Sequence, residues 1–303
     1  MHEQIAANKR KTVLLFIVAI AFTALIGYAI GFLFFFRGGV AGVVIATVLA
    51  VVLSLGSYFA GDRIVLASTG AREVTAEQEP RLHNIVDGIA IAAGVPKPRV
   101  YIVPEQAPNA FATGRDPEHS SIAVTQGLLD MMNRVELEGV IGHEMSHVQD
   151  RDILVGTLVA TLVGAAVLLS EFFMRAFFWG GFRGRRGNDS SGGIVEIVLL
   201  IVGFILVVLA PLFGQLIKLS VSRNREYLAD AQGAMLTRYP PGLISALQKI
   251  EAAPHAMRSA NNATAHLWLD QPSRFPGKQT GTLERLFSTH PPIEDRIHRL
   301  QEM

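Results

Sequence analysis

The sequence predicts a mainly α-helical membrane protein, with four transmembrane helices in two hairpins and a mostly helical soluble domain that contains a small β-sheet. Two observations carry this prediction. Half of the 303 residues are hydrophobic and the mean hydropathy is +0.34, whereas only 17% are charged, against about 25% in a typical soluble domain. The apolar residues also gather in four long stretches, between which the charge content is ordinary.

The four apolar stretches have the length of membrane spans. They cover residues 13–36, 40–60, 153–179 and 194–217. A helix needs about 20 apolar residues to cross roughly 30 Å of hydrocarbon, and core helices of soluble proteins rarely stay uncharged for so long. Glu171 and Arg175 interrupt the third stretch. The second hairpin therefore either spans the membrane or inserts only partly, and the sequence leaves both open.

Charges beside the first stretch predict its orientation. Lys9, Arg10 and Lys11 precede it, and it exceeds the about 7–15 apolar residues of a signal peptide, so we expect an uncleaved anchor. The positive-inside rule places this end, and with it both soluble segments, in the cytoplasm. Three arginines between the third and fourth stretches weaken the charge bias.

The expected organisation alternates membrane and soluble segments. It comprises a cytoplasmic N-terminus (1–12), a transmembrane hairpin (13–60), a soluble segment (61–152), a second hairpin (153–217) and a second soluble segment (218–303). Within the soluble segments we expect helices at 77–93, from 128 onward and at 293–300, strands at 99–103 and 121–125, a third strand at a sheet edge within 108–114, and a mobile loop over 253–281.

Composition also limits the chemistry. The 27 basic and 26 acidic residues give a net charge of +1, which argues against a strongly basic nucleic-acid binder, and no nucleic-acid partner is expected. The chain has no cysteine, so disulfides and thiolate metal sites are excluded. Any metal must be held by histidine, aspartate or glutamate.

One segment carries such a site. Val140 and Ile141 lead into a His-Glu-x-x-His motif formed by His143, Glu144 and His147. Histidines four residues apart share one face of a helix and can bind one ion. The glutamate beside them can reach a water on that ion, as in zinc peptidases. A surface helix with two histidines is the alternative that the motif alone leaves open.

A third ligand is needed, and Glu226 is the best candidate. Asp230 follows one turn later on the same face and can accept a hydrogen bond from a ligand histidine. His147 lies just before the second hairpin and Glu226 just after it. Because a hairpin returns its two ends to one place, it brings the two ligand helices together. The alternative is a solvated surface helix.

At this point the chain resembles the HtpX-like family of membrane-bound zinc metalloproteases, which is related to the CAAX-processing endopeptidases. The resemblance is carried by the two N-terminal spans, residues 109–114 (Asn-Ala-Phe-Ala-Thr-Gly), 143–147, the second hairpin, 222–230, and 288–292 (Ser-Thr-His-Pro-Pro) followed by Arg296. It implies a zincin-type (gluzincin-like) catalytic domain. It also implies one Zn²⁺ per chain on His143, His147 and Glu226, with Glu144 as catalytic acid/base.

The resemblance further implies a place and a role. It implies a multi-pass protein of the bacterial inner membrane, in contact with the lipid bilayer, whose catalytic domain faces the cytoplasm. The substrates it implies are membrane or misfolded proteins, cleaved in envelope quality control and the stress response. Cleavage specificity, physiological substrates and oligomeric state do not follow from the sequence.

Other residues are candidates for catalysis or substrate binding. Zinc would lower the pKa of a water, from which Glu144 would take a proton. His290, held by two following prolines, is either a second electrophile for the oxyanion or a structural loop histidine. Substrate would extend along the edge strand at Asn109, Ala110 and Phe111, where Asn109 is alternatively a turn residue. The remaining histidines are expected at the surface: His2, His83, His119, His255, His266 and His298.

Three other functions remain as alternatives. An intramembrane metalloprotease would carry the motif inside a span and an aspartate in a later span, whereas here the motif precedes the span and residues 194–217 contain no aspartate. A metal transporter should carry paired polar groups at mid-membrane, and only Glu196 is available in that stretch. A catalytically inactive metal-binding scaffold would keep the fold and tolerate loss of Glu144.

Overall fold

The computed structural model describes residues 10, 12–17, 39–176, 223–253, 257, 264–270 and 291–303. Most of the first predicted span and all of the fourth lie outside these residues. The helices are α2 (Gly39–Ser68), α3 (Pro80–Ala93), α4 (Gln126–Met131), α5 (Arg134–Gln149), α6 (Asp152–Ala176), α8 (Arg223–Thr237), α9 (Pro240–Ala252) and α11 (Ile293–Gln301), with 3-10 turns η1 (Pro117–His119) and η3 (Ala265–Leu267). The structure is thus mainly helical, as predicted.

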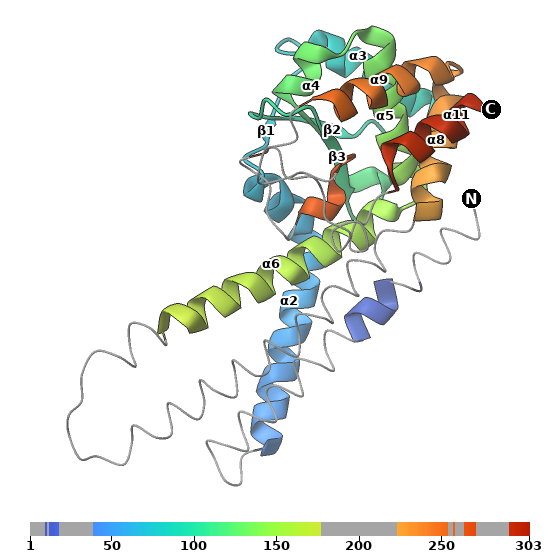
Figure 1. The fold of residues 1–303 in the computed structure, drawn as a ribbon. Coiled ribbons are helices and arrows are strands. Elements are labelled where there is room, and N and C mark those ends of the chain that lie inside the picture. The colour runs from blue at the N-terminus through green and yellow to red at the C-terminus, as the bar shows by residue number, and fades with distance from the viewer. Residues whose placement is uncertain are drawn as a thin grey trace.

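A small mixed sheet lies at the centre of the globular part (Figure 1). Its strands are β1 (Arg72–Glu73), β2 (Arg99–Val103), β3 (Ala110–Gly114) and β4 (Ser120–Thr125), in the order β1-β2-β4-β3. β2 and β4 are parallel, and the outer strands β1 and β3 are antiparallel to their neighbours. The predicted third strand is therefore confirmed at an edge of the sheet.

Helices cover both faces of this sheet, which explains why its central strands β2 and β4 are buried along almost their whole length. On one face, Val100, Ile122 and neighbouring side chains pack in one cluster with α3 and α5. On the other face, Tyr101, Phe111 and Ala123 pack with the last turns of α2 and with Trp268. The sheet thereby fixes α5 on one side, and the end of α2 and the first part of α6 on the other.

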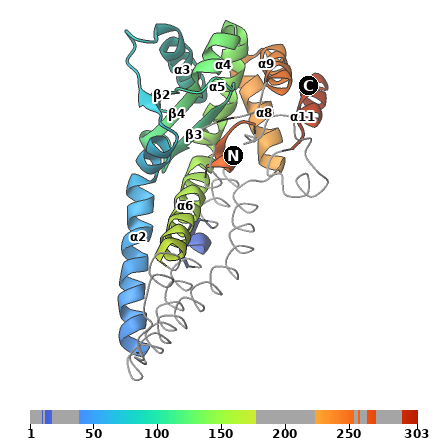
Figure 2. The same cartoon turned by 60° about the vertical axis from the view of Figure 1, so that its left-hand side comes forward.

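Helices α2 and α6 leave the globular part on the same side (Figures 1 and 2). Among the described residues, one helix is long and apolar enough to cross a membrane, within Val51–Ser68 of α2, and Asp152–Gly164 is a shorter apolar segment. Ile45, Val48 and Phe59 on α2 are each more than half exposed. Such a row of exposed apolar side chains is typical of a surface that meets lipid or another protein.

Close contacts hold the bases of these two helices together and join them to the sheet. A Cβ added at Gly61 on α2 would lie 2.8 Å from Cγ2 of Thr157 on α6, so only a small residue fits there. The Thr157 hydroxyl is 2.7 Å from that of Thr113, and the Gly114 backbone N–H donates to it at 3.1 Å. The apolar helices are thus attached directly to edge strand β3.

Three features differ from the sequence-based expectations. The helix expected from residue 128 onward is two helices, because Asn133 caps a new one. The boundary expected after residue 60 lies inside α2, whose last turns enter the core. The part of the expected loop at 264–270 is ordered around the buried Trp268.

Candidate metal centre

Helix α5 holds both histidines of the motif, and its first turn is fixed by reciprocal hydrogen bonds. The Asn133 side chain accepts from the Glu136 backbone N–H at 3.0 Å, and the Glu136 carboxylate accepts from the Asn133 N–H at 2.8 Å. This capping box satisfies donors that a helix start otherwise leaves to solvent. Glu136 also accepts from Ser245 and Lys249 on α9, at 2.6 and 2.7 Å. The helix is therefore anchored before it reaches the site.

Glycines set the distance between α5 and α8. A Cβ added at Gly233 would lie 2.7 Å from the backbone nitrogen of His143, and one added at Gly142 would lie 3.0 Å from the Gly233 carbonyl oxygen. Any larger residue would force the two backbones apart. Because Glu226 lies two helical turns before Gly233, this contact brings it to the histidine face of α5.

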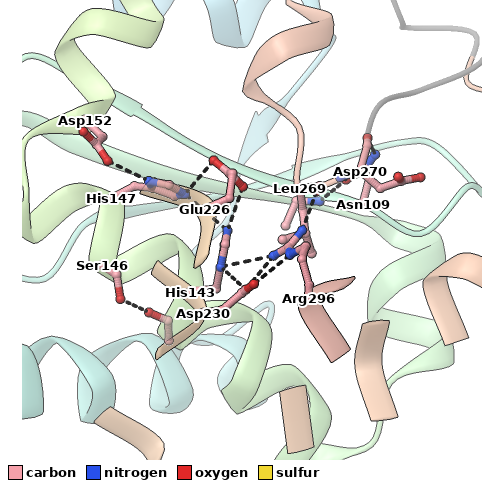
Figure 3. Close-up of polar contacts among 12 residues, drawn as sticks. Asn109, His143, Ser146, His147, Asp152, Glu226, Asp230, Leu269, Asp270 and Arg296 are labelled. Carbon is pink, nitrogen blue, oxygen red and sulfur yellow. Dashed lines mark hydrogen bonds and ion pairs between the residues drawn. The ribbon is translucent and has the colours of Figure 1, made fainter. Parts of the chain in front are cut away.

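His143, His147 and Glu226 converge at one point (Figure 3). The two Nε2 atoms are 3.2 Å apart. His143 Nε2 is 3.7 Å from Glu226 Oε2, and His147 Nε2 is 3.7 Å from Glu226 Oε1. His143 and Glu226 are 1% and 5% exposed, and the His147 side chain is 17% exposed, so the cluster is buried on the side of His143 and Glu226 and partly open at His147.

These three residues fit a single zinc ion. With zinc–ligand bonds of about 2.0–2.2 Å, neighbouring ligands of a tetrahedral site stand roughly 3.3–3.5 Å apart, and the three candidate atoms all lie within 4.8 Å of one another. Two imidazoles and one carboxylate leave the fourth position open for water. This is the donor set of catalytic rather than structural zinc.

A fully buried chain of charges holds His143. Its Nδ1 is 2.9 Å from Asp230 Oδ1, and Arg296 donates to both oxygens of that carboxylate, from Nε at 2.8 Å and from Nη2 at 2.6 Å. Burial disfavours the charged carboxylate, but Arg296 and His143 outweigh it and lower the pKa of Asp230 to about 2. Burial also lowers the pKa of His143, which favours the neutral imidazole that a metal requires.

A second chain of the same kind holds His147. Its Nδ1 is 3.2 Å from Asp152 Oδ2, and Arg225 Nη1 donates to Asp152 Oδ1 at 2.6 Å. Burial would lower the pKa of His147, but Asp152 and Glu226 together raise it to about 9. Each candidate ligand histidine therefore has its own carboxylate and its own arginine.

A pocket opens at the metal cluster. Glu144 lines it next to both histidines and is 2% exposed. Ala112 of β3 lies on another wall, and Ile153 and Gly156 of α6 on a third. Trp268 and its neighbours His266, Leu267 and Leu269 also line the pocket, and His266 Nε2 is 3.1 Å from the Gly156 carbonyl of α6. Metal ligands, Glu144 and an edge strand thus face one space.

The predicted substrate-binding residues lie deeper than an open groove would place them. Asn109, Ala110 and Phe111 are at most 3% exposed. Asn109 Nδ2 donates to the Asp270 carbonyl at 2.7 Å, and its Oδ1 accepts from the Asp270 N–H at 3.1 Å. The Ala110 carbonyl accepts from the N–H of Leu269 at 2.8 Å. All three residues hold residues 264–270 against the sheet. Phe111 does so through an edge-to-face contact with Trp268, with 4.7 Å between the ring centroids.

Sequence reasoning missed several residues around the site. His266, expected at the surface, is 4% exposed and lines the pocket, with Nε2 3.1 Å from the Gly156 carbonyl. That expectation was wrong because His266 lies in a sequence without helical or strand period. Asp152 and Arg225 were not singled out, although Arg225 directly precedes Glu226 and Asp152 lies five residues after His147. His290 lies outside the described residues.

The fold and the site define a class of protein: a peptidase in which one helix and a glutamate from a later helix hold a single zinc. Comparisons with known proteins agree. The model of Peptidase family M48 matches residues 76–303. The chain is 47% identical over 305 residues to a protease HtpX homolog of Thermoanaerobacter pseudethanolicus, covering 100% of this chain and 98% of that protein. It is 42% identical to one of Streptococcus gordonii, with 100% of both chains covered.

A solved structure supports the fold. Ste24p of S. mikatae matches 99% of this chain and 67% of its own, with a TM-score of 0.51 and 19% identity. The chain belongs to peptidase family M48 and is a membrane zinc metalloprotease. The three candidate ligands are the zinc-binding triad of this enzyme.

Proposed function

We propose that this enzyme cleaves membrane or misfolded proteins at the cytoplasmic face of the bacterial inner membrane, as part of envelope quality control under stress. The observation that carries the proposal is the position of the site. His147 lies only five residues before Asp152, the first residue of apolar helix α6. Ile153 and Gly156 of that helix line the active-site pocket. A polypeptide leaving the bilayer therefore meets the zinc site at once.

In the proposed mechanism Glu144 moves the proton. Zinc, when bound, acts as a Lewis acid that activates water and polarises the scissile carbonyl. A carboxylate oxygen of Glu144 takes the proton of the attacking water and then passes it to the leaving amine nitrogen. The carboxylates of Asp230 and Asp152 keep both ligand imidazoles oriented with Nε2 toward the metal. The buried position of Glu144 keeps bulk water away from the transferred proton.

We propose that substrate pairs with β3 at Ala112 rather than along the whole strand. Side-chain and backbone bonds from residues 269–270 already occupy the edge at Asn109 and Ala110. Residues of an antiparallel strand point their backbone groups alternately toward the two neighbours. Ala110 and Ala112 therefore present theirs to the same edge, and Ala112 lies on the pocket wall. An extended peptide there would run past the zinc triad.

The role of His290 is also a proposal. It immediately precedes the described C-terminal segment, whose Arg296 reaches the site. His290 would donate a hydrogen bond to the developing oxyanion. Replacement with glutamine should then lower kcat far more than it raises KM. Equal changes in stability and activity would instead indicate a structural loop histidine.

Metal analysis combined with proteolysis tests the main proposal. Wild type should hold about one zinc per chain and cleave an unfolded protein substrate, whereas Glu144→Gln should keep the zinc and lose about 10²–10⁴-fold in kcat. Zinc with equal activity in both proteins would contradict the role of Glu144.

Orientation has its own test. A reporter that is active only in the cytoplasm, fused at the C-terminus, should be active, and one that requires export should be silent. The opposite pattern would place the catalytic part outside the cytoplasm. This result would leave the zinc chemistry intact but overturn the proposed substrate source.

A further inference from the structure

The two ligand histidines are held by matching sets of groups. In each set an imidazole Nδ1 meets a carboxylate, as Figure 3 shows for Asp230 and Asp152. Each carboxylate also accepts from an arginine, Asp230 from Arg296 and Asp152 from Arg225. Asp230 and Arg296 serve His143. We propose that Asp152 and Arg225 are positioning residues for His147. We also propose that their contact couples assembly of the zinc site to the approach of the start of α6 to the start of α8.

The Asp152 carboxylate bridges His147 and Arg225. One of its oxygens is 3.2 Å from His147 Nδ1, and the other accepts from Arg225 Nη1 at 2.6 Å. The side chains of His147, Asp152 and Arg225 are 17%, 11% and 13% exposed. A carboxylate whose two oxygens each have a partner, and which is largely buried, is held more firmly than a carboxylate in an exposed surface pair.

The contact with Asp152 decides which nitrogen of His147 is available to the metal. Donation from Nδ1–H to Asp152 fixes the tautomer whose lone pair lies on Nε2. That Nε2 is the atom that faces His143 and Glu226, at 3.2 and 3.7 Å. Without Asp152 the ring could rotate or carry its proton on Nε2, and the ligand atom would be lost for part of the time. Asp152 thus acts through His147 and not on the substrate.

Asp152 and Arg225 lie at the starts of two helices that are far apart in the sequence. Asp152 is the first residue of α6, and Arg225 lies in the first turn of α8, directly before the ligand Glu226. All of the third and fourth apolar stretches lie between them in sequence. Any movement that separates the start of α6 from the start of α8 must therefore break the Asp152–Arg225 contact. The same movement carries Glu226 away from His147.

The test measures zinc affinity of the full chain in detergent, by competition with a chelator. Asp152→Asn keeps the size of the side chain but removes its charge, and it should weaken zinc binding about 10–100-fold. Arg225→Gln should weaken it less, because the carboxylate remains. The double variant should bind zinc no more weakly than Asp152→Asn alone, since Arg225 acts through Asp152. Asp87→Asn, which breaks an exposed pair with Lys97 at 3.7 Å, is the matched control and should change nothing.

Two further readouts separate positioning from a general structural effect. At saturating zinc, Asp152→Asn should regain most of the wild-type kcat, whereas Glu144→Gln should not. The unfolding midpoint of the metal-free proteins shows whether a variant folds, and if Asp152→Asn does not, Arg225→Gln alone decides through its zinc affinity. Unchanged zinc affinity in the folded variants, or effects that multiply in the double variant, would overturn the proposal. Because affinity is measured without a substrate, these outcomes are independent of whether the proposed proteolytic role is right.

Discussion

The two ligand histidines are held by the same chemical groups in two different settings. Around His143, the side chains of Asp230 and Arg296 are 3% and 1% exposed, and the arginine binds both carboxylate oxygens. Around His147, the side chains of Asp152 and Arg225 are 11% and 13% exposed, and one arginine nitrogen makes the contact. The first set belongs to the core, and the second lies at the base of the apolar helices.

This difference indicates a division of labour. A buried ion pair costs much desolvation energy and is destabilising to break, so the Asp230–Arg296 pair fixes the fold around α5, α8 and α11. The Asp152–Arg225 pair is less buried and joins two points separated in sequence by the third and fourth apolar stretches, so we expect it to have less effect on stability and more on metal binding. Variants can test each half of this contrast.

The largest effect is expected at Glu226, the zinc ligand whose carboxylate lies 3.7 Å from both ligand histidines. Glu226→Gln should reduce zinc content to background, a greater loss than the about 10–100-fold expected when a partner of a ligand is removed. Proteolysis should fall with it. Glu138→Gln serves as the control. It removes a surface pair with Arg134, at 2.9 Å, within the same helix α5 but away from the zinc ligands. Retention of one zinc by Glu226→Gln would show that the third ligand lies elsewhere.

The next effect separates the two settings directly. Asp230→Asn leaves Arg296 charged and buried, so the metal-free protein should lose about 3–5 kcal/mol of unfolding free energy. Asp152→Asn should cost only about 1–3 kcal/mol, because Arg225 keeps some access to water. Denaturation in detergent after zinc removal measures both values. Equal losses of unfolding free energy would contradict the expected difference between the Asp230–Arg296 pair and the Asp152–Arg225 pair.

A smaller effect is expected where α5 and α8 touch. Gly233→Ala should destabilise the protein by about 1–3 kcal/mol, since the new methyl group meets the His143 backbone and must push the helices apart. Zinc affinity should fall as well, because both histidines lie on α5 and Glu226 lies on α8. Gly88→Ala in α3, where a Cβ meets nothing within 4 Å, should instead stabilise by about 0.5–1 kcal/mol. A neutral Gly233→Ala would mean that this close approach does not set the ligand distances.

The same contrast explains what the sequence could and could not predict. The ligand positions were predicted from two rules: a four-residue helical spacing, and an expected hairpin that would return the chain to its starting point. The position of Asp152 follows from a feature that is harder to predict. Arg151 adopts a left-handed φ of 59°, and only two residues separate the end of α5 from the start of α6. Such a conformation is uncommon for a residue other than glycine, and no sequence pattern announces it. The buried positions of His266 and Asn109 likewise depend on residues 264–270 packing on the sheet, a contact between distant parts of the chain.

The smallest effect concerns Glu136, a buried carboxylate away from both histidine sets. Burial raises its pKa, but Lys249, Ser245 and Asn133 outweigh this and lower it below the ordinary value of 4.5. A lowered pKa in the folded state means that the charged form adds stability above about pH 4.5, and that this stability is lost as the pH falls further. Glu136→Gln should cost about 1 kcal/mol at pH 7, a modest value because the Lys249 side chain is 40% exposed.

The difference between Glu136→Gln and wild type should shrink as the pH is lowered through the range in which Glu136 gains its proton. Unfolding free energies at pH 7 and near pH 4 measure the change, with Glu138→Gln as a control at the surface. Zinc affinity at pH 7 should stay within a factor of about two, because Glu136 contacts α9 and not the ligands. A difference that stays constant with pH would show that Glu136 stabilises the start of α5 through shape alone, and a loss of zinc would show that the site depends on groups beyond the two histidine sets.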